Sequence, residues 1–386
     1  MIPYSKPSPI LPPELLQMIA ARLTDIVDYV SFRGVCSSWR SAARPADAPK
    51  QLPWLLLPYN PAAPARSFYG LSTARTYSFD CGAAVVGRVV CGSSFGWLAL
   101  IAPDSALSLW NPVTRAVLPL PPPTGLPSYL GPAAPRCEFG SRGLDEHCCP
   151  TASGCVRPGY PCRVSLSSGP AAPGCVALVV LALSSAFAYC RIGDTAWTVR
   201  ETGLEEDVNS VAFRDGRFYA LDSYGGGVVL DVDDPSRRSD IRNYYGSCLP
   251  LFGSYVTQAD DGNLYMLQNY VWFDEEEEEE QCLDVLRLVR KKGRYWWKKV
   301  RRVGDLAFFL SGNHASAVRP TGPPRGGGER VYFSEENCGA LEDLRTDGHG
   351  IRVFDLEEEE FKPCLRQWSV VPDASRSPTW VMPTLL

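Results

Sequence analysis

The stretch "SVAFRDGRFYALDSYGGGVVLDV", residues Ser210–Val232, decides the fold class of this 386-residue chain. Short apolar runs alternate there with two turn sequences, Asp215-Gly216 and Gly225–Gly227. Turn sequences of this kind between apolar runs are typical of antiparallel hairpins. The stretch therefore predicts three consecutive antiparallel strands.

Similar units follow one another over most of the chain beyond residue 49. Examples are Arg75–Cys81, Gly96–Ala102, Ala106–Pro112 and the turn Asp261-Gly262 before Leu264–Leu267. The apolar run Val176–Tyr189 is too short to span a bilayer and fits two adjoining buried strands, so we expect no membrane segment. Sandwich, barrel and propeller folds all use such units, but the length and the irregular repeat favour a propeller. We expect a mainly β chain with an irregular propeller of six or seven blades.

Two segments interrupt this pattern. The runs Glu275–Glu280 and Glu357–Glu360 carry ten of the 43 acidic residues, although the net charge is only −5. Because like charges repel, we predict solvated acidic loops at 274–281 and 357–360, with an acidic docking site as the alternative. Residues 131–161 are rich in Pro, Gly and Ser and are predicted to form an insertion loop.

The cysteines do not form a recognisable metal motif. The densest set is Cys137, Cys148, Cys149, Cys155, Cys162 and Cys175, with His147 nearby. No C-x-x-C pair occurs among the 14 cysteines, so the insertion-loop interpretation is favoured over a zinc site and we expect no metal or cofactor. The chain begins without a signal-peptide pattern, which predicts free thiols and a location in the cytoplasm, the nucleus or both.

A small helical unit precedes the strands. Pro12, Pro13 and Glu14 suit the first turn of a helix that would run from Pro12 to Leu23. Leu15, Leu16, Ile19 and Leu23 would form one apolar stripe on it. A second apolar pattern, Phe32, Val35, Cys36 and Trp39, predicts a helix over Phe32–Ala43. Amphipathicity alone leaves open whether the stripe is covered by the β body or by another protein.

The residues of this unit resemble the F-box motif. "LPPELLQMIAARL", followed by Asp28, Phe32 and "VCSSWR", has the spacing of that motif over residues 8–48. The resemblance implies docking on a Skp-type adaptor and, through it, on a cullin–RING ubiquitin ligase. It assigns the adaptor contacts to these side chains: Leu11, Pro12, Leu15, Leu16, Ile19, Leu23, Val35 and Trp39.

The β body resembles the KIB-type propeller of plant F-box proteins. The segments that carry the resemblance include "LSLWNPVTRAVLPLPP", "VGDLAFFLSGNHASAV" and the final "SPTWVMPTLL". The family implies that residues 49–386 form a propeller that holds a target protein, whose identity the sequence does not give. The expected function is a non-catalytic substrate receptor of an SCF-type ubiquitin ligase.

Two other functions remain open from the sequence. The chain has only three histidines, and none of them lies in a catalytic motif, so the sequence gives no support to an enzyme. One alternative to the ligase is a non-ligase scaffold, or a receptor whose F-box is no longer used. The stretch "RKKGRYWWKKVRR", residues 290–302, interleaves basic and aromatic side chains as nucleic-acid-binding proteins do. We favour a β-hairpin that turns at Lys292-Gly293, buries one aromatic face and is neutralised by the nearby run Glu275–Glu280.

Overall fold

The computed structural model describes residues 11–124, 126, 163–181, 184–234, 236–244, 251–273, 279–311, 314–320, 329–334, 349–368 and 378–385. The predicted insertion 131–161, the acidic residues 274–278 and all the cysteines of the candidate zinc set except Cys175 lie outside these ranges.

Four short helical segments open the described chain: α1 (Pro13–Ala20), α2 (Ile26–Gly34), α3 (Ser37–Ala42) and the 3₁₀ turn η1 (Pro45–Asp47). The single helix predicted over Phe32–Ala43 is wrong, because Gly34 ends α2 and Cys36 is fully extended (φ −164°, ψ 177°). Glycine favours a helix end at this point. The two elements still pack together, with the rings of Phe32 and Trp39 4.4 Å apart. None of the described helices is long and apolar enough to cross a membrane.

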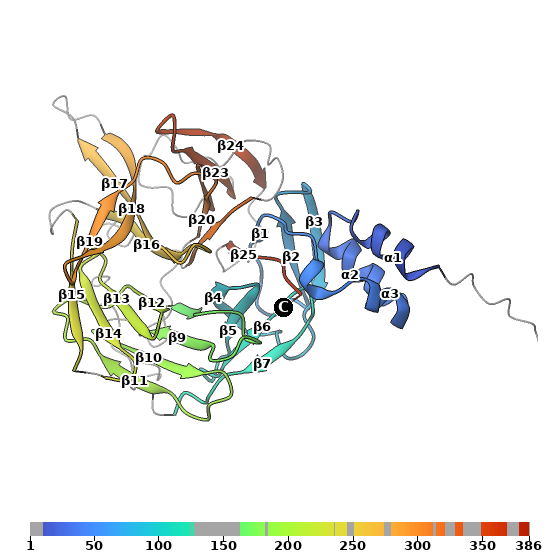
Figure 1. Ribbon diagram of the computed structural model, residues 1–386, viewed down its shortest axis with the longest axis horizontal. Coiled ribbons are helices and arrows are strands. Elements are labelled where there is room, and N and C mark those ends of the chain that lie inside the picture. The colour runs from blue at the N-terminus through green and yellow to red at the C-terminus, as the bar shows by residue number, and fades with distance from the viewer. Residues whose placement is uncertain are drawn as a thin grey trace, which may run out of the picture.

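The strands form five hydrogen-bonded sheets that stand around a common centre, as in a β-propeller (Figure 1). Three sheets have four strands, in the orders β25 (Thr379–Val381), β1 (Trp54–Leu56), β2 (Ala65–Gly70), β3 (Arg75–Asp80); β4 (Val89–Ser94), β5 (Trp97–Ile101), β6 (Leu107–Trp110), β7 (Val117–Pro119); and β11 (Thr198–Glu201), β10 (Ala186–Arg191), β9 (Val176–Val180), β8 (Arg163–Leu166). A fourth sheet has the order β21 (His314–Val318), β20 (Ala307–Ser311), β22 (Arg330–Ser334), β23 (His349–Asp355), β24 (Glu360–Trp368). The prediction of a mainly β propeller is confirmed.

The fifth sheet has eight strands, in the order β12 (Ser210–Arg214), β13 (Arg217–Leu221), β14 (Gly227–Asp231), β15 (Arg238–Arg242), β19 (Arg294–Lys299), β18 (Glu279–Lys291), β17 (Leu264–Phe273), β16 (Leu251–Gln258). It consists of two antiparallel four-stranded meanders. Only two parallel residue pairs join them, Ile241 with Tyr295 and Arg242 with Trp296. The described strands form five hydrogen-bonded sheets, so the number of sheets does not by itself establish the predicted six or seven blades.

Turns that the sequence predicts are found between the expected strands. Asp215 and Gly216, both at positive φ (50° and 72°), connect β12 to β13 in the tight turn that their sequence predicts. The run Val176–Tyr189 covers β9 and most of β10, which pair antiparallel, so the expectation of two adjoining strands is confirmed.

The last strand closes the ring. β25 pairs with β1, so a strand from the end of the chain completes the sheet begun by its first strands. Trp380 is fully buried, its ring lies 5.2 Å from that of Phe309, and its indole N–H donates to the carbonyl of Leu310 (3.0 Å). These contacts bind the closing strand to β20 of the neighbouring sheet as well.

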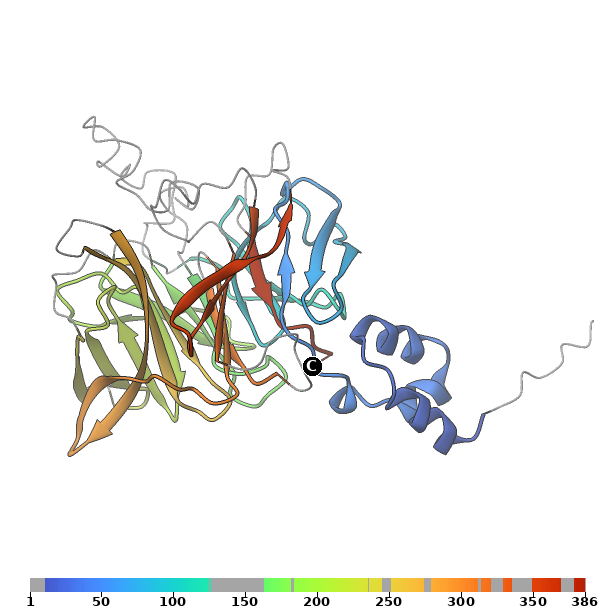
Figure 2. The same ribbon diagram turned by 90° about the horizontal axis from the view of Figure 1, so that it is seen from above.

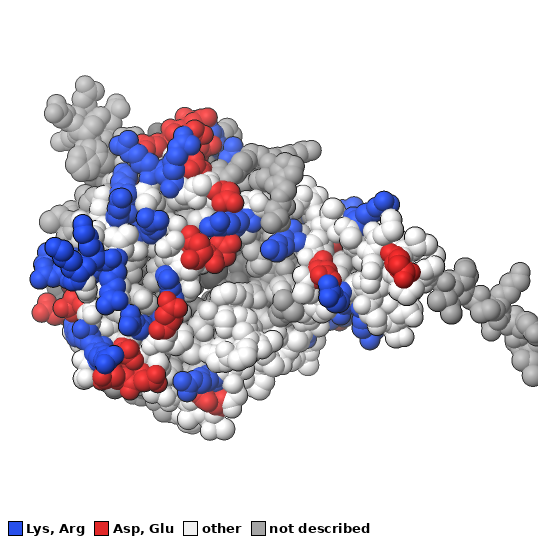
Figure 3. All heavy atoms as spheres, in the orientation of Figure 1, with Lys and Arg blue, Asp and Glu red and all other residues white. Residues whose placement is uncertain are grey.

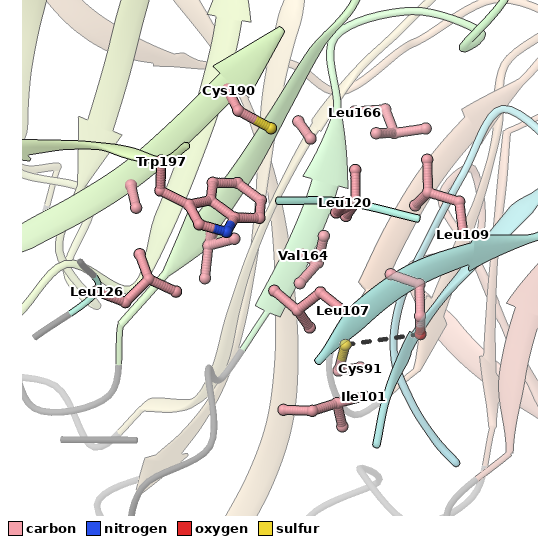
Figure 4. Close-up of a cluster of buried hydrophobic side chains, with 14 of the residues drawn as sticks. Cys91, Ile101, Leu107, Leu109, Leu120, Leu126, Val164, Leu166, Cys190 and Trp197 are labelled. Atoms are coloured by element: carbon pink, nitrogen blue, oxygen red, sulfur yellow. Dashed lines mark hydrogen bonds between the residues drawn. The ribbon is translucent and has the colours of Figure 1, made fainter. Parts of the chain in front are cut away.

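Apolar side chains fill the spaces between neighbouring sheets. Figure 4 shows one such cluster, in which side chains such as Leu109 and Ile101 from β4–β7 meet Val164, Leu166 and Cys190 from β8–β11. The approach of the sheets is close, because a Cβ on Gly92 would lie 1.8 Å from the carbonyl oxygen of Val164. Rotation of one sheet against the next is therefore blocked by packing.

Candidate functional site

Among the described residues, most of the large apolar side chains that are exposed to solvent lie on or next to helix α1. Leu15, Met18 and Ile19 are 45, 53 and 39% exposed, although their side chains are large and apolar. Their spacing, i, i+3 and i+4, places them on one face of the helix. Val35, at the end of α2, is 59% exposed. We call Leu15, Met18, Ile19 and Val35 the exposed apolar set.

The helical unit has a small core of its own. Leu16 is 2% exposed and packs with Ala20, Tyr29, Phe32 and Ala43. The hydroxyl of Tyr29 donates to the carbonyl of Arg44 (2.9 Å), which joins α2 to the chain that follows α3. The exposed apolar set takes no part in this core. The packing of the helical unit therefore does not explain why these four side chains are apolar.

The predicted adaptor-contact residues fall into three groups in the structure. Pro12, Leu15, Ile19 and Val35 are exposed; Leu11, Leu23 and Trp39 are half-buried against the core of the unit; and Leu16 is inside it. The stripe drawn from the sequence therefore mixes an outward and an inward face. Met18 was missed, although its position three residues after Leu15 is a signal that helical spacing contains.

Asp25 attaches the helical unit to the propeller. One carboxylate oxygen accepts the backbone N–H of Val27 (2.9 Å) and so caps the start of α2. The other accepts the hydroxyl of Tyr77 on β3 (2.6 Å), and the Arg75 guanidinium lies 3.6 Å away. Burial, assisted by this hydrogen bond, raises the pKa of Tyr77 to about 12.

Apolar packing reinforces this attachment. Ile26 of α2 is 1% exposed and belongs to the same cluster as Trp54 and Phe68 of the first sheet. Leu385 packs against both this cluster and the core of the helical unit. The buried Asn111 of the "WNP" segment donates to the carbonyl of Thr384 (3.1 Å), which holds the end of the chain in place. Figure 2 shows the helices standing out from the side of the propeller.

The axis of the propeller holds a cavity of about 220 Å³. Its lining comes from β4, β8, β9, β12, β16 and β21, together with Phe95 after β4 and Met382 after β25. Most of these side chains are small or apolar, and the exposed Phe95 stands among them. Within the described ranges, no group of three or more His, Cys, Asp or Glu side chains is placed to hold a metal ion.

The hairpin predicted over residues 290–302 is confirmed. Strands β18 and β19 pair up to Lys291 and Arg294, with Lys292 and Gly293 in the turn. Tyr295 and Trp297 are 6 and 4% exposed, and the indole N–H of Trp297 donates to the carbonyl of Gly225 (2.7 Å). These two rings are part of the core, so they offer no stacking platform for nucleic-acid bases.

The second acidic run is an exposed turn. Glu357, Glu358 and Glu359 lie in the turn between β23 and β24, Glu360 begins β24, and all four side chains are exposed. Glu357 pairs with Arg302 (2.9 Å), while Lys362 pairs with Glu358 and Glu360. Three of the four charges of this run are therefore paired, and all four side chains reach solvent.

Comparison with known proteins identifies this architecture as that of a described family of plant propellers. The family model KIB1-4 beta-propeller matches residues 68–355, and the chain belongs to that family.

Curated relatives from Arabidopsis thaliana carry F-box names. The chain is 29% identical over 57% of its length to the F-box protein SKIP23, and 29% identical over 59% of its length to an F-box/kelch-repeat protein. These matches span 54 and 56% of the two relatives, so about half of their length. A putative F-box protein is 24% identical, and the match covers 96% of both chains. The resemblance to plant F-box proteins with a KIB-type propeller is confirmed.

Among solved structures, YCF48 from Cyanidioschyzon merolae covers 61% of this chain and 63% of that one, with 10% identity and a TM-score of 0.35. A similarity of that size carries no argument about function.

Proposed function

We propose that this chain is a non-catalytic substrate-receptor subunit of an SCF-type ubiquitin ligase, in which residues 8–48 form the F-box. The observation that carries the proposal is the exposed apolar set on a unit that already has its own core. Burying half-exposed Leu, Met and Ile side chains would contribute about 1 kcal/mol each, enough for a docking surface. The F-box names of the relatives favour a Skp-type adaptor as the partner.

The propeller, residues 49–386, would hold the target protein. We count it as six blades, because the eight-stranded sheet consists of two meanders joined by only two residue pairs. The contacts of Asp25, Ile26 and Leu385 support a fixed angle between the helices and this propeller. A fixed angle would keep a bound target within reach of a ubiquitin-loaded enzyme, which raises their effective concentration.

Co-purification with a plant Skp-type adaptor tests the proposal. Leu15→Asp plus Ile19→Asp is expected to weaken adaptor binding about 100-fold or more, since two carboxylates would have to be desolvated at the interface. Both side chains are exposed, so the variant is expected to stay folded.

The matched control is Val86→Asp plus Phe95→Asp, which changes two exposed apolar residues of the propeller. This control is expected to bind the adaptor as the wild type does. Undiminished binding by the Leu15 and Ile19 variant would refute the assigned face. A folded wild type that recovers no adaptor at all would favour the non-ligase scaffold.

A further inference from the structure

Two neighbouring depressions lie on the propeller where the meander β12–β15 meets the hairpin β18–β19. Their volumes are about 300 and 320 Å³, and they share the side chains Arg217, Arg290 and Tyr295. Arg214 lines the first, and Arg237 and Arg238 line the second. We call these five arginines the basic face. In Figure 3, Lys and Arg side chains gather over the edge where β15 and β19 lie.

The described end of the acidic run is distant from this face along the chain of β18. Glu279 and Glu280, its last two residues, begin β18, whereas Arg290 and Lys291 lie at the other end of that strand. At about 3.3 Å per residue the two ends of the strand are roughly 40 Å apart, so the backbone places Glu279 and Glu280 far from the tip of the hairpin. Residues 275–278 lie outside the described residues, so the expected neutralisation stays a prediction.

Basic side chains form ion pairs at the base of the β18–β19 hairpin but not at its tip. At the base, Lys299 pairs with the buried Asp284 (2.6 Å) and Arg302 pairs with Glu357 (2.9 Å). At the tip, Lys291, Lys292 and Arg294 are exposed and form no ion pair with any described residue. The positive charge of the tip is therefore added to that of the basic face.

The guanidinium groups of the basic face are positioned by their neighbours. Arg290 lies over the ring of Tyr295, 5.4 Å from its centre, so its planar group is held against the wall that both depressions share. The other four guanidinium groups each have a carboxylate neighbour: Arg214 with Asp215 (3.0 Å), Arg217 with Asp231 (4.0 Å), Arg237 with Asp234 (3.3 Å) and Arg238 with Asp240 (3.1 Å). Arg290 forms no ion pair with a described residue, so it and the tip residues carry the uncompensated positive charge. Oriented guanidinium groups match carboxylates, with which they form paired hydrogen bonds.

We propose that the basic face docks an acidic segment, rich in Asp and Glu, of the protein that the propeller holds. The proposal rests on the proposed function for the identity of that protein as a target. Of the three rings of the hairpin, Tyr295 and Trp297 are buried and Trp296 is half-buried. The hairpin therefore has no row of exposed rings on which successive bases could stack, which favours a protein segment over a nucleic acid.

The test is the binding of a labelled peptide rich in Asp and Glu to the purified chain, measured by fluorescence anisotropy. Arg237→Glu plus Arg290→Glu is expected to weaken binding at least about tenfold, and added salt is expected to weaken the wild type. Lys50→Glu plus Arg191→Glu makes the same change of net charge at exposed sites outside the basic face and is expected to change the affinity less than about twofold. The same peptide with Asn and Gln instead of Asp and Glu is expected not to bind.

Three results would overturn the inference. They are no binding of the acidic peptide, an equal loss in both charge-reversal variants, and tighter binding of a single-stranded oligonucleotide than of the peptide. The peptide assay contains no adaptor. Peptide binding can therefore be absent while α1 still binds the adaptor, and the peptide can bind while α1 does not bind the adaptor, so the two proposals are tested separately.

Discussion

Large apolar side chains are exposed on the helical unit but buried in the propeller. On α1, Leu15, Met18 and Ile19 are 39 to 53% exposed, whereas Trp54, Trp110 and Phe309 in the strands are at most 1% exposed. A ring of sheets can cover the faces of every sheet with its neighbours, and β25 also closes the ring. In a unit of three short helices, each helix can bury only one of its faces against the other two. An apolar face on such a unit indicates a partner, while the closed propeller needs none to complete its core.

The largest expected loss of stability comes from removing a core side chain of the strand that closes the propeller. Trp380→Ala removes a fully buried ring and its hydrogen bond to Leu310 from the closing strand. The free energy of unfolding is expected to fall by about 3 to 5 kcal/mol. Urea unfolding followed by far-ultraviolet circular dichroism would measure it, and a loss below about 1 kcal/mol would show that β25 does not close the ring.

Two adjacent leucines sharpen the contrast within α1. Leu16→Ala is expected to destabilise the helical unit by about 2 to 4 kcal/mol, because this side chain is 2% exposed. Leu15→Ala, at 45% exposure, is expected to change stability by less than about 0.5 kcal/mol. Hydrogen exchange of the α1–α3 amides separates the two variants, and equal exchange rates would contradict the inward and outward assignment.

The smallest effect concerns the attachment between the two regions. The pKa of Tyr77 is raised from 10.0 to about 12 in the folded state, so this proton is held there after the unfolded chain has released it. The contribution of Tyr77 to stability is therefore complete below pH 10 and is lost as the pH rises towards 12.

Tyr77→Phe tests this attachment. The variant is expected to be about 1 to 2 kcal/mol less stable than the wild type below pH 10, because Asp25 loses the donated hydrogen bond. The difference is expected to shrink between pH 10 and 12. Urea unfolding at a series of pH values measures it, and a difference that stays constant with pH would argue against the buried hydrogen bond.

Local signals in the sequence predicted the parts of the fold that depend on local chemistry. Asp215-Gly216 and Lys292-Gly293 marked their turns because both positions of each pair adopt positive φ. The pairing of β25 with β1 joins residues 379–381 to residues 54–56, which are far apart in the sequence, and no local pattern encodes it. The break at Cys36 was also hidden, because the apolar spacing of Phe32 and Trp39 continues across it.

The candidate site was predicted in outline and corrected in detail. Helical periodicity identified the apolar residues of α1, but it did not separate Leu16, which faces inward, from Leu15, which faces outward. That separation depends on where α2 and α3 pack, which is tertiary information. The role of Asp25 was hidden for the same reason, since its partner Tyr77 lies on a strand of the propeller.

The most direct test of the central claim is site-specific photo-crosslinking from the exposed face of α1. A benzophenone side chain would replace Leu15 in one variant and Phe95, also exposed but on the propeller, in the other. In the presence of a plant Skp-type adaptor, the account predicts a covalent adduct with the adaptor from position 15 and none from position 95. No adduct from position 15, or equal adducts from both positions, would contradict it.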